Sequence, residues 1–402
     1  MAREHRTGDD ATAPGHGWPA WRRRGWALLL AAVSLPALAT PRVPASDAEI
    51  LGEVPAGAHH AELAARRMAR GRVDVAVPLA QFYIGQSRAT GDLRFLGYAE
   101  AVLGPWVEPG KDVPAALVLL ATLQQSRHEF AQSLRTLDRS LAARPRDPQA
   151  WLTRATVLRV MGRYPEAEAS CRKFAEQTDA TLGAICRESV LGLHGALATA
   201  YAALEQLSPQ GLAAPERAWR DSELGEMAVR LGNDAAAERW FRDGLVQTPA
   251  DFYVRAAYAD LLLRHARARE ALTLLQGGES IEPLLLRIAI AQKQLHDPGL
   301  AVSRARLGAA FSAEAARGEA IHRRELARYL LEVEGRPRDA LAEALQNWQL
   351  QREPDDALVL VDAARAAGSP ASAAPALDFL AAQGLRDARL ARAPGAAVRL
   401  RS

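Results

Sequence analysis

Small residues recur at an interval of 34 along this 402-residue chain, and this interval constrains the fold more than any other feature of the sequence. Ala121 and Ala155 are 34 residues apart (155 − 121), and so are Gly225 and Ala259 (259 − 225). Apolar residues at helical spacing flank these positions, which predicts pairs of short amphipathic helices. A helix pair of this size cannot bury its apolar faces alone, so the interval predicts a stack of helical hairpins that cover one another.

Two stretches show the repeating unit most clearly, at 150–174 and at 221–249. In each stretch two amphipathic helices meet at a glycine, Gly162 or Gly232, because a left-handed backbone conformation is cheapest for glycine. Pro249 closes the second stretch, since proline cannot continue a helix. The small residues are expected where two helix backbones approach closely. No stretch offers a convincing run of alternating β-branched residues, so we expect an all-α chain.

The interval and the order of residue types resemble the tetratricopeptide repeat, whose pattern is W-x2-L-G-x2-Y…A-x3-F…P. Three copies carry the resemblance: Trp151, Arg154, Ala155, Leu158, Ala167 and Cys171; Asp221, Leu224, Gly225, Ala228, Ala237, Phe241 and Pro249; and Arg255, Tyr258, Ala259, Leu262, Ala271 and Leu275. The resemblance implies a right-handed superhelical solenoid of antiparallel helix hairpins over 59–384, with roughly seven to nine hairpins. The best repeats are expected at 114–181 and 218–281. Residues 40–58 should be loosely ordered, and the Arg- and Ala-rich tail at 385–402 should fray.

Residues 1–39 are typical of a secretory signal peptide. Three arginines at 22–24 precede a short apolar run, which ends in the A-L-A sequence of residues 37–39 and so provides a cleavage site near Ala39. A single membrane anchor is the alternative, but the run is shorter than the ~20 apolar residues that a spanning helix needs. A twin-arginine signal is an alternative export route. We therefore predict a periplasmic or secreted protein with no transmembrane segment in the mature chain, or alternatively one anchored in the inner membrane.

The two cysteines of the chain, Cys171 and Cys186, both follow the predicted signal peptide. In an exported protein an isolated pair is a disulfide candidate, and this bridge would close a loop of about 15 residues between adjacent helices. The alternative is two small residues buried in a seam of the core. No CxxC motif is present, so redox catalysis is not expected.

Charge and motifs argue against a nucleic-acid partner and against an enzyme. The first 39 residues hold five basic and three acidic side chains, and subtracting these from 50 and 47 leaves 45 and 44 in the rest of the chain. Such a balance gives no basic footprint for a polyphosphate. There is no Walker A motif, no GxGxxG after a strand, no HExxH and no G-x-S-x-G. His59 and His60 point about 100° apart on a helix and cannot share an ion. We expect no catalytic residue, no metal site and no cofactor.

The tetratricopeptide resemblance also implies a concave groove, which the first helices of successive repeats line. With residues 114, 148, 218 and 252 as first positions, the groove positions and their neighbours give these candidate partner contacts: Gln125, Gln149, Arg159, Trp219, Glu226, Arg230, Tyr253, Asp260 and Arg264. Trp219 and Tyr253 are large aromatic groups beside charges, which often dominate binding energy. Alternatively, Trp219 covers the junction after a proline-containing break. Basic residues do not recur at the positions of the carboxylate clamp that chaperone-tail-binding members use.

The sequence therefore predicts a non-catalytic periplasmic scaffold that binds a protein or peptide partner of unknown identity. An accessory subunit of a cell-envelope export or assembly machine is a more specific version of this prediction. A murein-acting enzyme is the alternative from another class, although no stretch is left over for a catalytic domain. A cytoplasmic regulator with a membrane anchor is a further alternative.

Overall fold

A computed structural model describes residues 56–316 and 322–391 of the chain. The chain divides into two units after Pro55, and every described residue belongs to the second unit. The predicted signal peptide at 1–39 and residues 40–55 of the predicted loose segment lie outside the described residues.

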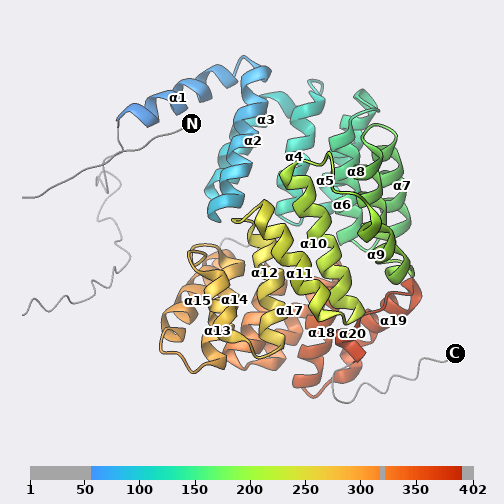
Figure 1. The fold of residues 1–402 in the computed structure, drawn as a ribbon. Helices are drawn as coiled ribbons and strands as arrows, with labels where there is room; N and C mark the ends of the chain where they lie inside the picture. Colours follow the sequence, from blue (N-terminus) through green and yellow to red (C-terminus); the bar gives the residue numbers. More distant parts are fainter. Residues whose placement is uncertain (1–55, 317–321, 392–402) are drawn as a thin grey trace, which may run out of the picture. The chain divides into compact units, whose positions relative to one another are not determined.

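The described part of the chain contains only helices and the turns between them, which confirms the predicted all-α solenoid of helix hairpins (Figure 1). The helices are α1 (Ala56–Ala69), α2 (Val73–Thr90), α3 (Arg94–Val107), α4 (Pro114–Ser126), α5 (Phe130–Ala143), α6 (Pro148–Val160), α7 (Tyr164–Ala175), α8 (Ala180–Leu191), α9 (Leu197–Gln206), α10 (Ala214–Leu231), α11 (Asp234–Gln247), α12 (Phe252–Arg264), α13 (Ala268–Leu275), α14 (Glu282–Gln294), α15 (Leu300–Ala316), α16 (Arg323–Arg328), α17 (Pro337–Leu350), α18 (Pro354–Ala366), α19 (Ala374–Gln383) and α20 (Ala388–Ala391). A π-helical turn at Tyr329–Glu334 extends α16, and a 3-10 turn at Pro370–Ala373 precedes α19. Among these described helices, the pairs from α2–α3 to α18–α19 make nine hairpins.

Helix starts follow the turn chemistry of the sequence. Pro114 and Pro148 stand in the first turns of α4 and α6, and Phe252 begins α12, so three of the four predicted first positions coincide with helix starts. The fourth is displaced, because α10 begins at Ala214, four residues before the predicted position (218 − 214). Pro215 occupies its first turn and sets this earlier start. The predicted loose segment also ends early, since α1 begins at Ala56 rather than after residue 58.

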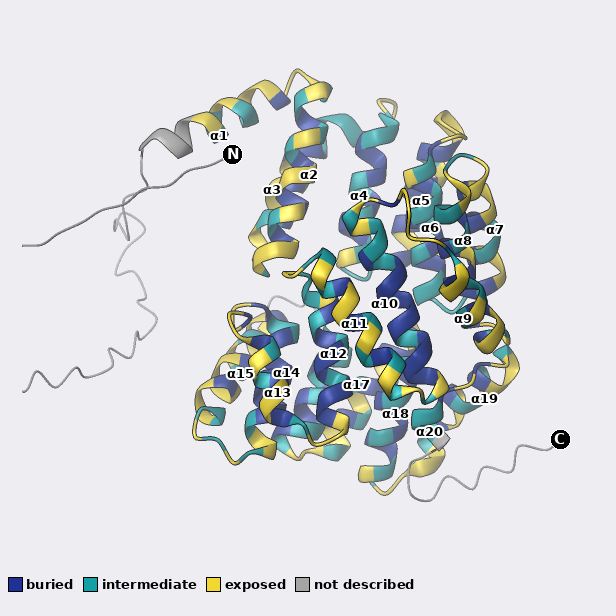
Figure 2. Ribbon diagram, viewed as in Figure 1, coloured by how far each residue is buried: buried dark blue, intermediate teal, exposed yellow. Residues whose placement is uncertain are grey.

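The small residues lie between packed helices, as the repeat pattern predicts. Ala155 is 3% exposed, and Ala237 and Ala259 are fully buried. Gly162 and Gly232 follow α6 and α10 with φ of +74° and +76°, where a side chain would be strained. Figure 2 shows the result along the hairpins, with buried residues on the facing sides of the helices and exposed residues on their outer sides.

The later hairpins contact the earlier ones. The backbone N–H of Arg352, after α17, donates to the carbonyl of Val160 at 2.8 Å. The Tyr164 hydroxyl, at the start of α7, donates to the carbonyl of Arg352 at 3.0 Å. These bonds hold the loop between α17 and α18 against the α6–α7 hairpin.

The C-terminal prediction is partly wrong. Leu385 is only 8% exposed, and its N–H donates to the carbonyl of Leu380 at 2.9 Å. α20 then contacts α10 and α18. The described residues of the predicted frayed tail are therefore fixed by burial of Leu385 and by ion pairs of Arg389, whereas 392–402 lie outside the described part.

A disulfide joins Cys171 of α7 to Cys186 of α8, as the sequence predicts, with the Cα atoms 5.5 Å apart. The cysteines are 0% and 2% exposed, so the bridge also lies in the core seam that was its alternative. No helix within the described ranges has both the length and the apolar content that crossing a bilayer requires.

Candidate functional site

The first helices of five successive hairpins, α10, α12, α14, α16 and α18, line a cavity of about 560 Å³. A second cavity of about 530 Å³ adjoins it. The two cavities share seven lining residues: Val229, Asp260, Arg264, Arg287, Arg324, Asp355 and Arg389. Because they share these walls, we treat the two adjoining cavities together and call them the charged groove.

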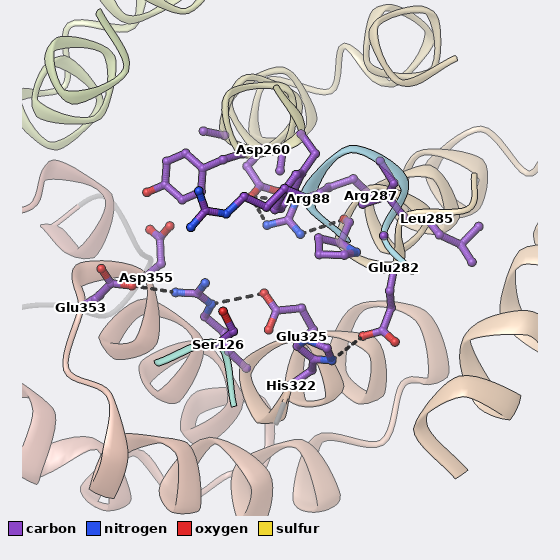
Figure 3. Close-up of a pocket in the computed structure, with 18 of the residues that line it drawn as sticks. Arg88, Ser126, Asp260, Glu282, Leu285, Arg287, His322, Glu325, Glu353 and Asp355 are labelled. Carbon is purple, nitrogen blue, oxygen red and sulfur yellow. Dashed lines mark hydrogen bonds and ion pairs between the residues drawn. The ribbon is translucent and has the colours of Figure 1, made fainter. Parts of the chain in front are cut away.

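Asp260 of α12 ties three hairpins together at the wall of the charged groove. Arg287 of α14 donates from Nη2 to its Oδ2 at 2.7 Å, and Arg328 of α16 donates from Nη2 to its Oδ1 at 2.9 Å. Burial alone would raise the pKa of Asp260, but the two guanidinium groups outweigh it and lower the pKa to about 2. Figure 3 shows the pair of Asp260 and Arg287 among the lining side chains. Asp260 is therefore a permanently charged structural tie.

The C-terminal helix brings a further cation into the charged groove. Arg389 of α20 donates from Nη1 to Asp355 at 2.5 Å and from Nη2 to Asp387 at 2.6 Å. On the neighbouring wall, Arg324 of α16 donates from Nη1 to Glu353 at 3.3 Å. These pairs fix the start of α18 between α16 and α20.

Tyr253 and Glu226 face the charged groove from adjacent first helices. The Tyr253 hydroxyl donates to the Glu226 carboxylate, which links α12 to α10. Burial, strengthened by the nearby carboxylate of Glu223, raises the pKa of Glu226 to about 7. Tyr253 keeps 47% of its surface exposed, so its ring is accessible from within the groove.

Four arginines that line the larger cavity, Arg88, Arg230, Arg264 and Arg306, make no ion pair with a carboxylate of the described residues. Arg230 is buried and donates to the carbonyl of Gly192 at 2.6 Å, and Arg306 donates to the carbonyl of Glu279 at 2.9 Å, whereas Arg88 and Arg264 are exposed. Arg264 ends α12, and Arg88 lies in the last turn of α2. The packing of the groove around Arg264 and the neighbouring cation of Arg389 lower its pKa, whereas the carboxylates of Asp260, Asp355 and Asp387 act in the opposite direction, so the charge is partly compensated.

The structure places five of the nine predicted partner contacts on the wall of the larger cavity: Glu226, Arg230, Tyr253, Asp260 and Arg264. The other four do not line either part of the charged groove. Arg159 donates to Glu223 at 2.6 Å, and Trp219 donates from Nε1 to the same carboxylate at 3.3 Å. Gln149 is exposed and bonds Thr153 within α6, and Gln125 is half-buried near the end of α4.

Sequence reasoning missed the remaining charged residues of the groove. Arg287, Arg324, Asp355 and Arg389 belong to helices in which the tetratricopeptide pattern is weak, so no groove positions were assigned there. The only feature of the sequence that could have indicated these groove residues was the spacing of arginines and acidic residues along the later helices. That spacing is also typical of a solvated helix face, which is why it did not single them out.

A cluster of possible metal ligands lies at the edge of the larger cavity. His322 donates from Nδ1 to Glu314 at 2.6 Å and lies 3.3 Å from the Oε1 atom of Glu282. Burial would lower the pKa of His322, but the carboxylates of Glu314, Glu282 and Glu325 outweigh it and raise the pKa to about 9. Burial raises the pKa of Glu282 to about 7. No metal site was predicted from the sequence, because Glu282 precedes Glu314 by 32 residues (314 − 282) and the three residues form no known ligand motif.

Comparisons with known proteins give only similarity of fold. The sequence matches no family model and no curated protein. Among solved structures, the chain is similar to PilF of Pseudomonas aeruginosa, at 19% identity over 61% of this chain and 94% of that one, with a TM-score of 0.32. It is also similar to a tetratricopeptide repeat protein of Parabacteroides merdae, at 15% identity over 58% and 93%, with a TM-score of 0.37.

A third similar structure is the human IFIT1 dimer with m7Gppp-AAAA, at 10% identity over 81% of this chain and 85% of that one, with a TM-score of 0.45. All three TM-scores lie below 0.5. The assignment of a tetratricopeptide-like helical repeat therefore rests on the hairpins, their interval and the buried small residues described above.

Proposed function

We propose that this chain is a non-catalytic scaffold that binds an acidic segment of a protein partner in the charged groove. The observation that carries the proposal is Arg264, an exposed arginine that lines the charged groove without an ion pair within the described residues, on the same helix as the exposed ring of Tyr253. The neighbouring arginines Arg287, Arg324 and Arg389 are each held by a carboxylate. A guanidinium that has no ion pair can bind a carboxylate with two parallel hydrogen bonds. A side chain of Asp or Glu, or a chain terminus, supplies that group.

Tyr253 provides the second element of the proposed binding surface. Its ring is exposed beside Glu226 and one face of the groove, and rigid aromatic side chains contribute strongly to binding at interfaces. Around both elements the lining is rigid, because ion pairs such as that of Asp260 with Arg287 join successive hairpins. A preformed groove of this kind loses little conformational entropy when a partner binds.

Site-specific photocrosslinking in cells tests the proposal. A crosslinking residue at Tyr253 should capture a defined partner, whereas one at Val246, which is 75% exposed on α11, should not. Arg264→Glu should weaken capture by about 5-fold, since an exposed charge pair contributes up to about 1 kcal/mol. Arg269→Glu, an exposed charge reversal on α13, is the matched control. Equal capture from both positions, or equal effects of both charge reversals, would refute groove binding.

We further propose that the scaffold works in the periplasm. The disulfide of Cys171 with Cys186 supports this location, because such bridges persist in oxidising compartments. A reporter fused after Ala45 that is active only outside the cytoplasm is the expected result. Activity only in the cytoplasm, together with free thiols at both cysteines, would contradict it.

A further inference from the structure

We propose that Glu282, Glu314 and His322 form a site for one divalent transition-metal ion at the edge of the charged groove. Glu282 comes from the first turn of α14, Glu314 from α15, and His322 stands immediately before α16. One ligand atom from each of the three lies within 4.8 Å of the other two. One imidazole nitrogen with two carboxylate oxygens is a donor set that suits Zn²⁺ and also Mn²⁺.

Hydrogen bonding by His322 does not satisfy both of the carboxylates that face it. The single N–H at Nδ1 is used by Glu314 at 2.6 Å. Glu282 Oε1 is buried and receives no hydrogen bond within the described part of the chain, although Nδ1 lies only 3.3 Å away. One proton cannot serve two acceptors in different directions, whereas one metal ion can contact all three atoms.

One of the separations between ligand atoms already has the value that a metal ion would impose. For ligand bonds of about 2.0 to 2.1 Å in a tetrahedral site, two ligand atoms lie roughly 3.3 to 3.4 Å apart. The separation of Glu282 Oε1 from His322 Nδ1 already has this value. Glu314 would need to withdraw by about 0.7 Å (3.3 − 2.6), which a side-chain rotation supplies. Binding would displace the Nδ1 proton, because a ligating imidazole nitrogen must be free of it.

The site is open on one side. The side chains of Glu282 and His322 are 20% and 21% exposed and both line the larger cavity, while that of Glu314 is 9% exposed. Figure 3 shows Glu282 and His322 directed toward each other beside Glu325. Arg324 pairs with Glu325 at 3.4 Å, so the carboxylate of Glu325 already has a cationic partner beside the proposed site. Three protein ligands with one open position leave room for water or another oxygen donor. The two cysteines do not compete for the ion, because they are bridged.

Metal analysis of the full chain, produced without a histidine tag and stripped with chelator, tests the site. After dialysis against Zn²⁺ alone, and separately against Mn²⁺ alone, we expect about one equivalent of Zn²⁺ per chain and weaker retention of Mn²⁺, as the affinity series predicts. Glu282→Gln and His322→Ala should each lower Zn²⁺ retention at least tenfold. His265→Ala, which removes an exposed histidine paired with Asp234, should leave it unchanged.

Two results would overturn the proposal. One is retention below a tenth of an equivalent by the wild-type chain. The other is equal retention by the wild type, Glu282→Gln and His322→Ala, which would place the ion elsewhere. If a variant fails to fold, as judged by circular dichroism, the zinc K-edge spectrum of the wild type decides instead. One imidazole with oxygen ligands supports the site, and two or more imidazoles refute it.

Discussion

Replacing Gly225 with alanine tests whether the two helices of one hairpin are as close as the repeat pattern requires. A Cβ atom at Gly225 of α10 would lie 2.4 Å from Cε1 and 2.6 Å from Cδ1 of Phe241 on α11. Ordinary van der Waals contact begins at 3.4 Å, so the ring or the helix must move by about 1.0 Å (3.4 − 2.4). Phe241 is 1% exposed, and a close-packed interior offers no free space for that movement.

Two opposing effects set the magnitude. Alanine in place of glycine inside a helix stabilises by up to about 1 kcal/mol. Overpacking a filled core destabilises by roughly 1 to 3 kcal/mol. Overpacking should prevail at Gly225, with a net loss of up to about 2 kcal/mol. Gly244 of α11 is the matched control, because the nearest atom to a Cβ there is 3.7 Å away. Gly244→Ala should therefore stabilise by about 0.5 to 1 kcal/mol.

Urea unfolding of the two variants, followed by circular dichroism, measures this difference. Because a stack of hairpins need not unfold in one step, hydrogen exchange of the α10 amides should be measured beside the midpoints. Phe241→Leu, added to Gly225→Ala, should cost less than it does in the wild type, since the smaller side chain relieves the clash. The reasoning fails if Gly225→Ala is as stable as Gly244→Ala.

Three further predictions concern the bridge and the charged groove. Replacing both Cys171 and Cys186 with alanine should lower the free energy of unfolding by about 3 kcal/mol, because the bridge spans 15 residues; an unchanged urea midpoint would contradict this. Asp260→Asn should destabilise by about 3 to 5 kcal/mol, as it leaves Arg287 buried without its carboxylate, and a thermal melt that matches the wild type would count against the tie. The pKa of Glu226 is raised from 4.5 to about 7, so its contribution to stability is fully present below pH 4.5 and is lost as pH rises through 7. Glu226→Gln should remove this loss and be more stable than the wild type at pH 8, and identical pH profiles of the two proteins would show that the shift is absent.

The repeat was visible in the sequence because its rules act within one hairpin. Ala237 is small because the two helices of its own hairpin pack closely, and Gly232 forms the turn between those helices. Both requirements arise within one hairpin, so a single stretch of sequence is enough to recognise them. The start of α10 was missed because Pro215, inside an apparent break, sets it. The hairpins after α13 depart from the tetratricopeptide pattern. Their bounds could be predicted only from the Gly- and Pro-containing turns and from the spacing of apolar residues.

The charged groove could be predicted only in part, since it depends on how successive hairpins are placed against one another. Asp260 and Arg328 are paired across 68 positions of the chain, and Arg389 and Asp355 across 34. No local pattern indicates such pairs. The same reason explains the cluster around His322, whose ligands become neighbours only after α14, α15 and α16 have packed.

The ion pairs in the charged groove serve to fix the positions of successive hairpins rather than to add to the free energy of folding. Removing a carboxylate and a guanidinium from water costs about as much as their attraction returns, so a buried pair adds little to the free energy of folding. A displaced pair is expensive, however, because each partner is then left buried alone. Asp260 therefore penalises any arrangement of α12, α14 and α16 other than the one in which Arg287 and Arg328 both reach it. In a groove fixed in this way, Arg264 keeps one position on the wall, exposed and without an ion pair of its own within the described residues, where the carboxylate of a partner can reach it.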